Sequence, residues 1–430
     1  MSNLLPATAD LLPVSQMAET LIGSEIIKLA AQINQRIDQG ETIYNFTIGD
    51  FDPTLFPIPD AMKLGIMEAY THNETNYPDA NGMEILRKAV AELIQNTQQL
   101  NYPLNEILIS CGGRPLIYAL YRTILDAGDQ VVFPVPSWNN NHYTHLSGCN
   151  AVMIETSEED NFMPTAQLLA PHLNEAALLA LCSPLNPTGT VFGRQQLFDI
   201  CQLVLTINKK RSLNGQKPLY VLYDQIYSAL TFGQTQHHDP VTLCPDMRPY
   251  TIFVDGVSKA FAATGVRVGW AFGPQRIVAK MRAILSHVGA WPARSEQLGV
   301  ANFLNNPQAV AKYSKWFKAE LYARLDGIYK VFKSLNEQGY PVKAIAPQAA
   351  IYLTVKIDLK GKTKPNGEVL TSTAAVTDFI LQQAGIALVP FYAFGSDHES
   401  TWYRLSVGTC QLADIDKLYN ALRNAMDILR

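Results

Sequence analysis

Between about residues 60 and 300, short apolar runs alternate with amphipathic stretches of helical length. The runs are short enough to be buried strands, and they comprise Ile107–Ile109, Val131–Phe133, Ala151–Ile154, Leu178–Leu181, Tyr220–Tyr223 and Thr251–Val254. Segments long enough for helices, such as Leu116–Leu125 and Gln195–Asn208, lie between several of them. This alternation of strands and helices is typical of an α/β domain with a mainly parallel sheet.

The rest of the chain predicts a second set of elements. A helix is expected between Gly23 and Gly40, followed by a strand at Ile43–Ile48. Later in the chain the pattern predicts a long helix over 308–338 and then further strands and helices at Ala350–Ile357, Thr373–Gln383, Tyr403–Val407 and Leu412–Leu429. We therefore expect a large α/β domain at 60–305 and a smaller α+β domain formed by 1–59 with 306–430.

Composition narrows the functional classes. A length of 430 residues exceeds the usual size of one hydrophobic core, which also favours two domains. The net charge of −4 and the lack of an extended basic run argue against nucleic acid as a partner. Without a run of about 18 apolar residues or a signal-like N-terminus, we expect a soluble cytoplasmic protein that has no membrane partner. Six cysteines without CxxC spacing predict neither disulfides nor a metal site.

The most informative segment follows the apolar run Thr251–Val254. Lys259 stands where this predicted strand gives way to a loop, and a desolvated lysine can lose its proton and attack a carbonyl carbon to form a Schiff base. Arg267 is permanently charged and can bind a phosphate through two parallel hydrogen bonds. Together the two residues point to pyridoxal 5′-phosphate (PLP) as the cofactor, whereas for an isolated pair a surface lysine beside a structural arginine is the alternative.

Ser258-Lys259, followed by Gly265-x-Arg267-x-Gly269, resembles the cofactor-lysine motif of class I/II aminotransferases. This aspartate aminotransferase family belongs to the PLP-dependent transferases of fold type I, and the resemblance extends over nearly the whole chain. It implies an α/β fold with a large domain on a mainly parallel sheet and a smaller α+β domain. It also implies that Lys259 carries the cofactor and that Ser258 and Arg267 help to bind it.

Polar residues follow several predicted strands, and ligands bind at the carboxyl ends of strands in open α/β sheets. Asp224 can pair with a protonated pyridine nitrogen, which lets the ring act as an electron sink. Tyr227 can donate to the 3′-oxygen of PLP. Asn186 lies in Asn-Pro-Thr-Gly, a signature in which, by the resemblance, asparagine contacts this oxygen and the substrate carboxylate. We expect Lys259, Asp224 and Tyr227 to be the catalytic residues.

The junction Ser110–Arg114 between a predicted strand and a predicted helix exposes free backbone N–H groups, which favours a bound anion. The resemblance assigns Gly113 and Arg114 to the PLP phosphate through their backbone amides and leaves the role of the Arg114 side chain open. Trp138 follows the strand Val131–Phe133 and is expected to stack on the cofactor ring, beside the substrate.

The sequence departs from the family pattern at two places. Some relatives have, three residues after the tryptophan, a histidine that supports the aspartate. Here that position is Asn141, and His142 stands next to it, so both are candidates to support Asp224. Gly256 stands where many relatives carry a phosphate-binding serine or threonine, which predicts one weakened phosphate contact.

Arg404 lies in a predicted strand of the small domain without an adjacent acidic residue, and its guanidinium suits a bidentate carboxylate. The resemblance assigns Arg404 to the α-carboxylate of the substrate and places Gly49 beside it. Tyr77 begins a Tyr-x-x-x-x-Gly stretch whose tyrosine, in the family, reaches the phosphate in the neighbouring subunit. The resemblance therefore implies a homodimer with a composite active site.

These residues predict an aminotransferase that moves the amino group of an L-amino acid to a 2-oxo acid in a ping-pong cycle. Aspartate with 2-oxoglutarate is the first expectation, and Arg294 and Arg114 are candidates for the cation that a second carboxylate needs. A pocket for aromatic or other large neutral donors is the alternative, lined by Phe51, Trp291, Phe391 and Tyr392. A PLP-dependent β-elimination lyase, which would share every site residue, is the other alternative.

Overall fold

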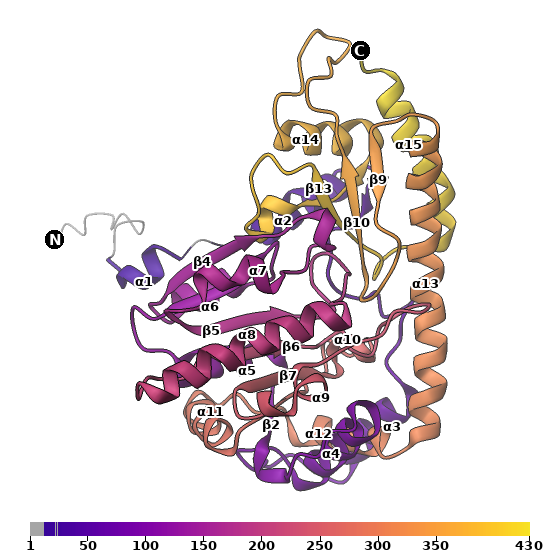
Figure 1. Cartoon of the computed structure of the whole chain (residues 1–430). Coiled ribbons are helices and arrows are strands. Elements are labelled where there is room, and N and C mark those ends of the chain that lie inside the picture. The colour runs from indigo at the N-terminus through magenta and orange to yellow at the C-terminus, as the bar shows by residue number, and fades with distance from the viewer. Residues whose placement is uncertain (1–12, 22, 24) are drawn as a thin grey trace, which may run out of the picture.

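The computed structural model describes residues 13–21, 23 and 25–430; the remaining residues of the predicted small domain, 1–12, 22 and 24, lie outside it. Within the described part, the central sheet has seven strands in the order β2 (Ile107–Ser110), β8 (Gly269–Phe272), β7 (Thr251–Gly256), β6 (Tyr220–Asp224), β5 (Ala176–Cys182), β3 (Gln130–Val135) and β4 (Asn150–Glu155) (Figure 1). Only β8 runs antiparallel to its neighbours among these strands. This is the mainly parallel sheet that the sequence predicts.

Successive residues of the central strands face two different cores, because side chains alternate along a strand. Ile252 and Val254 pack on one face, whereas Phe253 packs on the other. The first face is covered by α5 (Gly113–Ile124), α6 (Asn140–Leu146) and α11 (Gln275–Val288), and the second by α3 (Asp60–Thr71), α4 (Glu84–Gln98), α8 (Arg194–Leu213) and α12 (Arg294–Leu304). Burial of both faces explains why these strands are continuous apolar runs in the sequence. The short helices α7 (Ala166–Leu169) and α9 (Pro240–Leu243) connect the strands.

A smaller antiparallel sheet contains β12 (Val389–Pro390), β13 (Trp402–Ser406), β10 (Tyr352–Ile357) and β9 (Val342–Ala344). Its side chains share a core with α13 (Pro307–Glu337), α14 (Thr373–Ala384) and α15 (Ile415–Asp427). The N-terminal segment, which includes α1 (Gln16–Glu19) and α2 (Glu25–Asp38), joins this part through β1 (Tyr44–Asn45), which pairs in parallel with β11 (Ile386–Ala387).

The helix α13 runs along one side of the molecule from the group of α3, α4 and α12 to the small sheet (Figure 1). It begins where the sequence predicts, because Asn306 accepts a hydrogen bond of 3.0 Å from the backbone N–H of Ala309 and Pro307 occupies the first helical position. The helix therefore spans both parts of the chain, and the division into domains at residues 59/60 and 305/306 stays a prediction.

Two local expectations differ from the structure. The strand predicted at 43–48 is only two residues long, as is β11, with which it pairs. Lys259, expected in a loop, lies in the one-turn helix α10 (Val257–Ala260), which is closed by a 3.1 Å hydrogen bond from the N–H of Phe261 to the carbonyl of Val257. Within the described residues, no helix combines the length and the apolar character that crossing a membrane requires.

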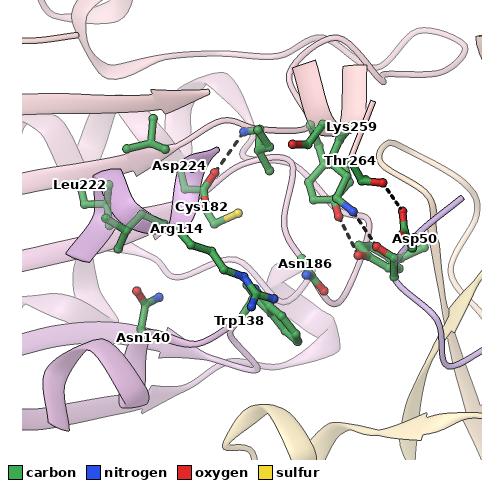
Figure 2. A pocket seen from close by; sticks show the side chains of 18 of the residues that line it. Asp50, Arg114, Trp138, Asn140, Cys182, Asn186, Leu222, Asp224, Lys259 and Thr264 are labelled. Atoms are coloured by element: carbon green, nitrogen blue, oxygen red, sulfur yellow. Dashed lines mark hydrogen bonds between the residues drawn. The ribbon is translucent and has the colours of Figure 1, made fainter. Parts of the chain in front are cut away.

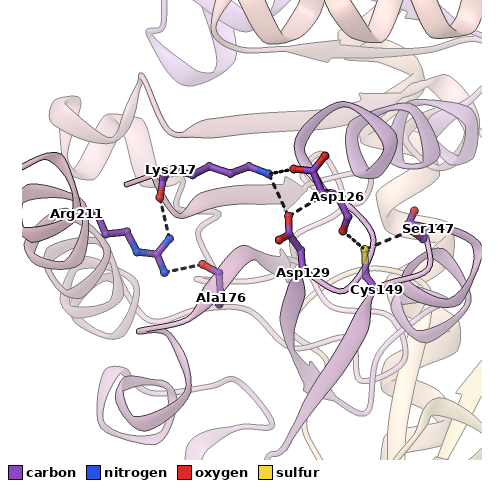
Figure 3. Close-up of polar contacts among 7 residues, drawn as sticks. All are labelled: Asp126, Asp129, Ser147, Cys149, Ala176, Arg211 and Lys217. Carbon is purple, nitrogen blue, oxygen red and sulfur yellow. Dashed lines mark hydrogen bonds and ion pairs between the residues drawn. The ribbon is translucent and has the colours of Figure 1, made fainter. Parts of the chain in front are cut away.

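The amino ends of the central strands are held by polar contacts among the loops (Figure 3). Lys217, just before β6, pairs with Asp129 at 3.0 Å and with Asp126 at 3.4 Å, both of which precede β3. Arg211 at the end of α8 donates a 2.7 Å hydrogen bond to the carbonyl of Ala176 in β5. These contacts align the strands at the edge opposite to their carboxyl ends, where the polar residues predicted from the sequence gather.

Candidate active site

A cavity of about 550 Å³ lies at the carboxyl ends of β5, β6 and β7 and reaches across to β10 and β13 of the small sheet. Apart from Tyr77, every residue to which the sequence analysis assigns a catalytic, cofactor-binding or α-carboxylate-binding role lines it: Gly49, Gly113, Arg114, Trp138, Asn186, Asp224, Tyr227, Ser258, Lys259, Arg267 and Arg404. Figure 2 shows several of these side chains converging on the same space. The fold thus brings together residues from most of the length of the chain.

Lys259 points into this cavity from α10. Its amino group donates a 2.6 Å hydrogen bond to the backbone carbonyl oxygen of Gly49. Burial is the main cause that lowers the pKa of Lys259 to about 8, an effect that the carboxylate of Asp50 opposes and that the nearby arginines reinforce. A lysine with this pKa is available as a neutral nucleophile at physiological pH much more often than a surface lysine.

One end of the cavity is built for an anion. The helix α5 begins at Gly113, and Gly112 before it has a φ of 93°. Arg267 donates hydrogen bonds to the carbonyls of Thr264 (2.6 Å) and Cys111 (3.0 Å), and a side chain at position 112 would collide with its guanidinium. A helix N-terminus beside a fixed guanidinium is a ready site for a phosphate group.

The departure at Gly256 has a steric reason. A Cβ atom at this position would lie 2.9 Å from the Cα of Gly269 and 2.9 Å from the carbonyl oxygen of Val268. Both atoms belong to backbone that adjoins β8, so the neighbouring strand leaves no room for a serine or threonine. The close approach of β7 and β8 therefore excludes a hydroxyl-bearing side chain at position 256.

Asp224 and Trp138 flank the middle of the cavity. Asp224 ends β6, and burial is the main cause that raises the pKa of its carboxyl to about 6, whereas a hydrogen bond of 3.1 Å from the N–H of Ile226 lowers it. The guanidinium of Arg114 lies 5.3 Å from the ring of Trp138, a cation–π contact, and both residues line the cavity. Among the described residues Asp224 forms no ion pair, and a buried carboxyl of this kind suits the protonated nitrogen of a bound heterocycle.

The candidates for support of Asp224 occupy different positions from those expected. Asn141 is exposed, and among the described residues of α6 the cavity is lined by Asn140 and Tyr143 rather than by Asn141 or His142. The first turn of α6 directs these two side chains inward. Asn140 donates a 2.7 Å hydrogen bond to Ser137 and accepts one of 3.0 Å from Tyr121, which holds its amide in place.

Arg404 forms the opposite wall. It is almost completely buried, with an exposed fraction of 1%, between the rings of Tyr352 at 4.7 Å and Phe394 at 4.9 Å. Its guanidinium donates to the side chain of Asn186 at 3.1 Å and to the carbonyl of Thr47 at 2.7 Å, whereas its Nε atom has no partner among the described residues. A buried cation without a carboxylate partner is costly unless a ligand supplies one.

The lining residues that were not identified from the sequence include Tyr352, Thr264 and Asp50. The hydroxyl oxygens of Tyr352 and Tyr227 form a hydrogen bond of 2.6 Å. The hydroxyl of Thr264 donates a 2.7 Å hydrogen bond to the carboxylate of Asp50. Thr264 and Asp50 close one side of the cavity (Figure 2). Sequence signals existed for two of them, since Asp50 follows Gly49 and Thr264 lies within the segment that contains Lys259 and Arg267.

Tyr77 and Arg294, which the sequence analysis singled out, also lie outside this cavity. Tyr77 is 83% exposed and packs only the edge of its ring against Trp291, at 5.9 Å between ring centres. Arg294 forms an ion pair with Glu74 and does not line the cavity. In the single chain, Tyr77 therefore lies on the surface, and the charge of Arg294 is already paired with that of Glu74.

Comparison with known proteins agrees with this geometry. The sequence model of the family "Aminotransferase class I and II" matches residues 41–422. A probable aspartate/prephenate aminotransferase from Rickettsia conorii is 28% identical over 89% of this chain and 91% of its own length. An aspartate aminotransferase from a Bacillus species is 27% identical over 89% of this chain and 92% of its own. The crystal structure of an aspartate aminotransferase from Rhizobium meliloti superposes with a TM-score of 0.87 and 25% identity, covering 97% of this chain and all of that one.

Proposed function

The chain belongs to the family of class I and II aminotransferases, and we propose that it moves the amino group of L-aspartate to 2-oxoglutarate in a ping-pong cycle that depends on PLP. Aminotransferase activity follows from the family. Lys259 carries the rest of the proposal, because an amine with a pKa of about 8 lies beside a phosphate-type site, a buried carboxyl and the open Nε of Arg404. A cytoplasmic location remains a prediction.

The residues present fit PLP. Gly113, Ser258 and Arg267 would hold its phosphate, Trp138 its ring face, and Asp224 its ring nitrogen. Bound there, PLP supplies an aldehyde for amines and a ring that accepts electrons from the substrate α-carbon. Asp224 would keep a proton on the ring nitrogen, and Tyr227 and Asn186 would offer hydrogen-bonding groups to the 3′-oxygen.

Lys259 is the proposed proton carrier. In its neutral form, the Nζ atom of Lys259 takes the α-proton of the substrate and releases it again later in the cycle. General acid–base catalysis of this kind typically raises the rate about 10²–10⁴-fold. The hydrogen bond to the carbonyl of Gly49 holds the amine within the cavity. The lowered pKa of about 8 gives Lys259 a larger neutral fraction at physiological pH than an ordinary lysine has.

Arg404 and Arg114 are the proposed partners of the two carboxylates of aspartate. Arg404 would bind the α-carboxylate, for which its unpartnered Nε and its fixed plane are suited. Arg114 lines the cavity, whereas Arg294 is paired with Glu74 outside it, so Arg114 is the better candidate for the distal carboxylate. The names of the Rickettsia and Bacillus relatives agree with a dicarboxylate substrate. The aromatic residues suggested for a large neutral donor, Phe51, Trp291, Phe391 and Tyr392, do not line the described cavity.

A homodimer with a composite site is part of the proposal. Leu64, Met67 and Tyr70 are between 50% and 60% exposed on the outer side of α3, whose inner side packs on α12. These three side chains, the α3 surface, are apolar and exposed and of the kind that a second copy of the chain would cover, and the ring of Tyr77 is exposed as well. Tyr77 would then reach the phosphate of the partner subunit.

The proposed reaction is tested by incubating the PLP-loaded protein with aspartate and 2-oxoglutarate and measuring oxaloacetate and glutamate. Equal amounts of both products, formed only when both substrates are present, support the proposal. Pyruvate and ammonia formed without an oxo acid from an amino acid that carries a β leaving group, such as serine or cysteine, would instead indicate a lyase. Turnover of aromatic donors without turnover of aspartate would reject the proposed substrate.

A further inference from the structure

Two buried tyrosines meet hydroxyl to hydroxyl at the wall of the cavity. Tyr227 follows β6 and Tyr352 begins β10; their oxygens are 2.6 Å apart and their rings pack edge to face at 5.5 Å. Burial is the main cause that raises the pKa of both phenols, so both carry their hydrogen at neutral pH. One hydroxyl must therefore donate this hydrogen bond, and the other must accept it.

Tyr352 also contacts the residue proposed to bind the α-carboxylate. Its ring lies 4.7 Å from the guanidinium of Arg404, on β13, which pairs with β10. A Cβ atom at Gly49 would lie 2.9 Å from the hydroxyl of Tyr352, so the segment around residue 49 closely covers this hydroxyl. The place of Tyr352 is therefore fixed by Tyr227, Arg404 and the backbone of Gly49.

The direction of the hydrogen bond follows from the proposed function, on which this inference rests. If Tyr227 gives its hydrogen to the 3′-oxygen of PLP, its oxygen is free to accept, and the hydrogen in the pair must come from Tyr352. We propose that Tyr352 is a positioning residue whose hydroxyl donates to Tyr227, so that the hydrogen of Tyr227 points into the cavity, and whose ring fixes the plane of Arg404. A single side chain thereby serves the cofactor and the substrate carboxylate.

Two consequences differ from those of a merely structural tyrosine. A hydroxyl that accepts one hydrogen bond becomes a stronger donor in the next, by about 10–30% per bond. Tyr352 therefore helps Tyr227 to stabilise a negative charge on the 3′-oxygen. The ring and the hydroxyl of Tyr352 also act on different quantities, because the ring contacts Arg404 and the hydroxyl contacts Tyr227.

The test compares Tyr352→Phe, Tyr227→Phe and the double variant, all loaded with PLP, by the pH midpoint of the visible absorption band. Tyr352→Phe removes only the hydroxyl and is expected to raise the midpoint by about half a unit, since one hydrogen bond is lost indirectly. Tyr227→Phe is expected to raise it further, and the double variant is expected to match Tyr227→Phe alone. An unchanged midpoint in Tyr352→Phe, or additive shifts in the double variant, would overturn the inference.

Two further variants separate the ring from the hydroxyl and provide a control. Tyr352→Leu removes the ring from Arg404 and is expected to raise KM for the amino acid about three- to tenfold above that of Tyr352→Phe. Tyr403→Phe removes a hydroxyl from the same small sheet, whose contacts are Thr377 and Thr373, and is expected to leave both midpoint and KM unchanged. Equal values of KM in Tyr352→Leu and Tyr352→Phe would contradict the role of the ring.

The same experiment distinguishes failure of the inference from failure of the proposed function. If the PLP-loaded protein shows no visible band that depends on Lys259, as tested by Lys259→Ala, both the inference and the proposed function are overturned. A band that depends on Lys259 but does not respond to Tyr352→Phe would overturn the inference alone.

Discussion

The amino group of Lys259 donates a 2.6 Å hydrogen bond to the backbone carbonyl oxygen of Gly49. Lys259 follows β7 of the central sheet, and Gly49 follows β1, which pairs with β11 beside the small sheet, so the bond joins the two parts of the chain at the cavity. The partner is a neutral carbonyl rather than a carboxylate, which agrees with the lowered pKa of the amine. The lysine is therefore placed for chemistry while it remains deep within the protein.

Arg404→Ala is expected to weaken substrate binding strongly. A charge-assisted hydrogen bond is worth about 1.5–3 kcal/mol, so KM for the amino acid is expected to rise about 10- to 100-fold. Arg404→Lys keeps the charge but loses the planar pair of donors, and an intermediate KM is expected. The content of bound PLP, measured in parallel, is expected to stay unchanged. Loss of PLP with an unchanged KM would place Arg404 at the cofactor instead.

Arg114 and Arg294 provide a matched pair for the distal carboxylate. Arg114→Ala is expected to raise KM for aspartate at least about tenfold and to affect alanine far less, because alanine lacks the second carboxylate. Arg294→Ala is expected to leave both values close to those of the unchanged protein, since Arg294 is paired with Glu74 outside the cavity. The reverse result in steady-state kinetics would assign the distal carboxylate to Arg294.

Asp224 is expected to lower the stability of the protein without PLP above pH 6. Burial raises its pKa to about 6 in the folded chain, from an ordinary value of 3.8. The folded state therefore binds the proton of Asp224 more tightly than the unfolded state does. The protonated carboxyl contributes its full stability below about pH 4, and this stability is lost as the pH rises through 6. Asp224→Asn is expected to raise the free energy of unfolding by about 2–3 kcal/mol at pH 8 and by little at pH 4.

Urea unfolding of both proteins at these two pH values measures the effect of Asp224→Asn. Transamination is expected to fall in the same variant, because an amide cannot hold a proton on the ring nitrogen as a carboxylate does. A gain in stability of equal size at both pH values would show that the carboxylate of Asp224 is not the cause.

The α3 surface is expected to be the dimer contact. Met67→Glu places a charge on it and is expected to lower the dimer fraction and the retention of PLP, measured by sedimentation and by absorbance after gel filtration. Leu213→Glu, a change at an 82% exposed position on α8, serves as the control and is expected to alter neither. If the protein without any substitution is monomeric and fully active, the proposal of a composite active site is contradicted.

Much of this architecture could be predicted because the central strands are buried on both faces. Thr251–Val254 is a continuous apolar run for this reason, and the polar residue at the end of each such strand falls at one edge of the sheet. Asp224 and Asn186 could therefore be assigned to one site, because Asp224 ends β6 and Asn186 follows β5, together with the resemblance to the family. Lys259 was identified in the same way.

Other parts of the site depend on pairings that one sequence does not specify. Tyr352 lies within a predicted strand, but only the register of β10 against β13, which pairs Thr354 with Arg404, places it on the same side as Arg404. Likewise, whether Asn141 or His142 faces the cavity depends on the residue at which α6 begins. The observed start at Asn140 turns the side chains of Asn140 and Tyr143 inward instead. The paired state of Arg294 depends on Glu74, which is 220 residues away in the chain.

The visible absorption spectrum of the PLP-loaded protein, recorded as single amino acids are added without any oxo acid, tests the central claim most directly. We predict that aspartate replaces the visible band by one at shorter wavelength typical of pyridoxamine phosphate, that 2-oxoglutarate restores it, and that Lys259→Ala shows neither change. A band that no amino acid alters, or one that responds equally well in Lys259→Ala, would contradict the assignment of Lys259 and the proposed transamination.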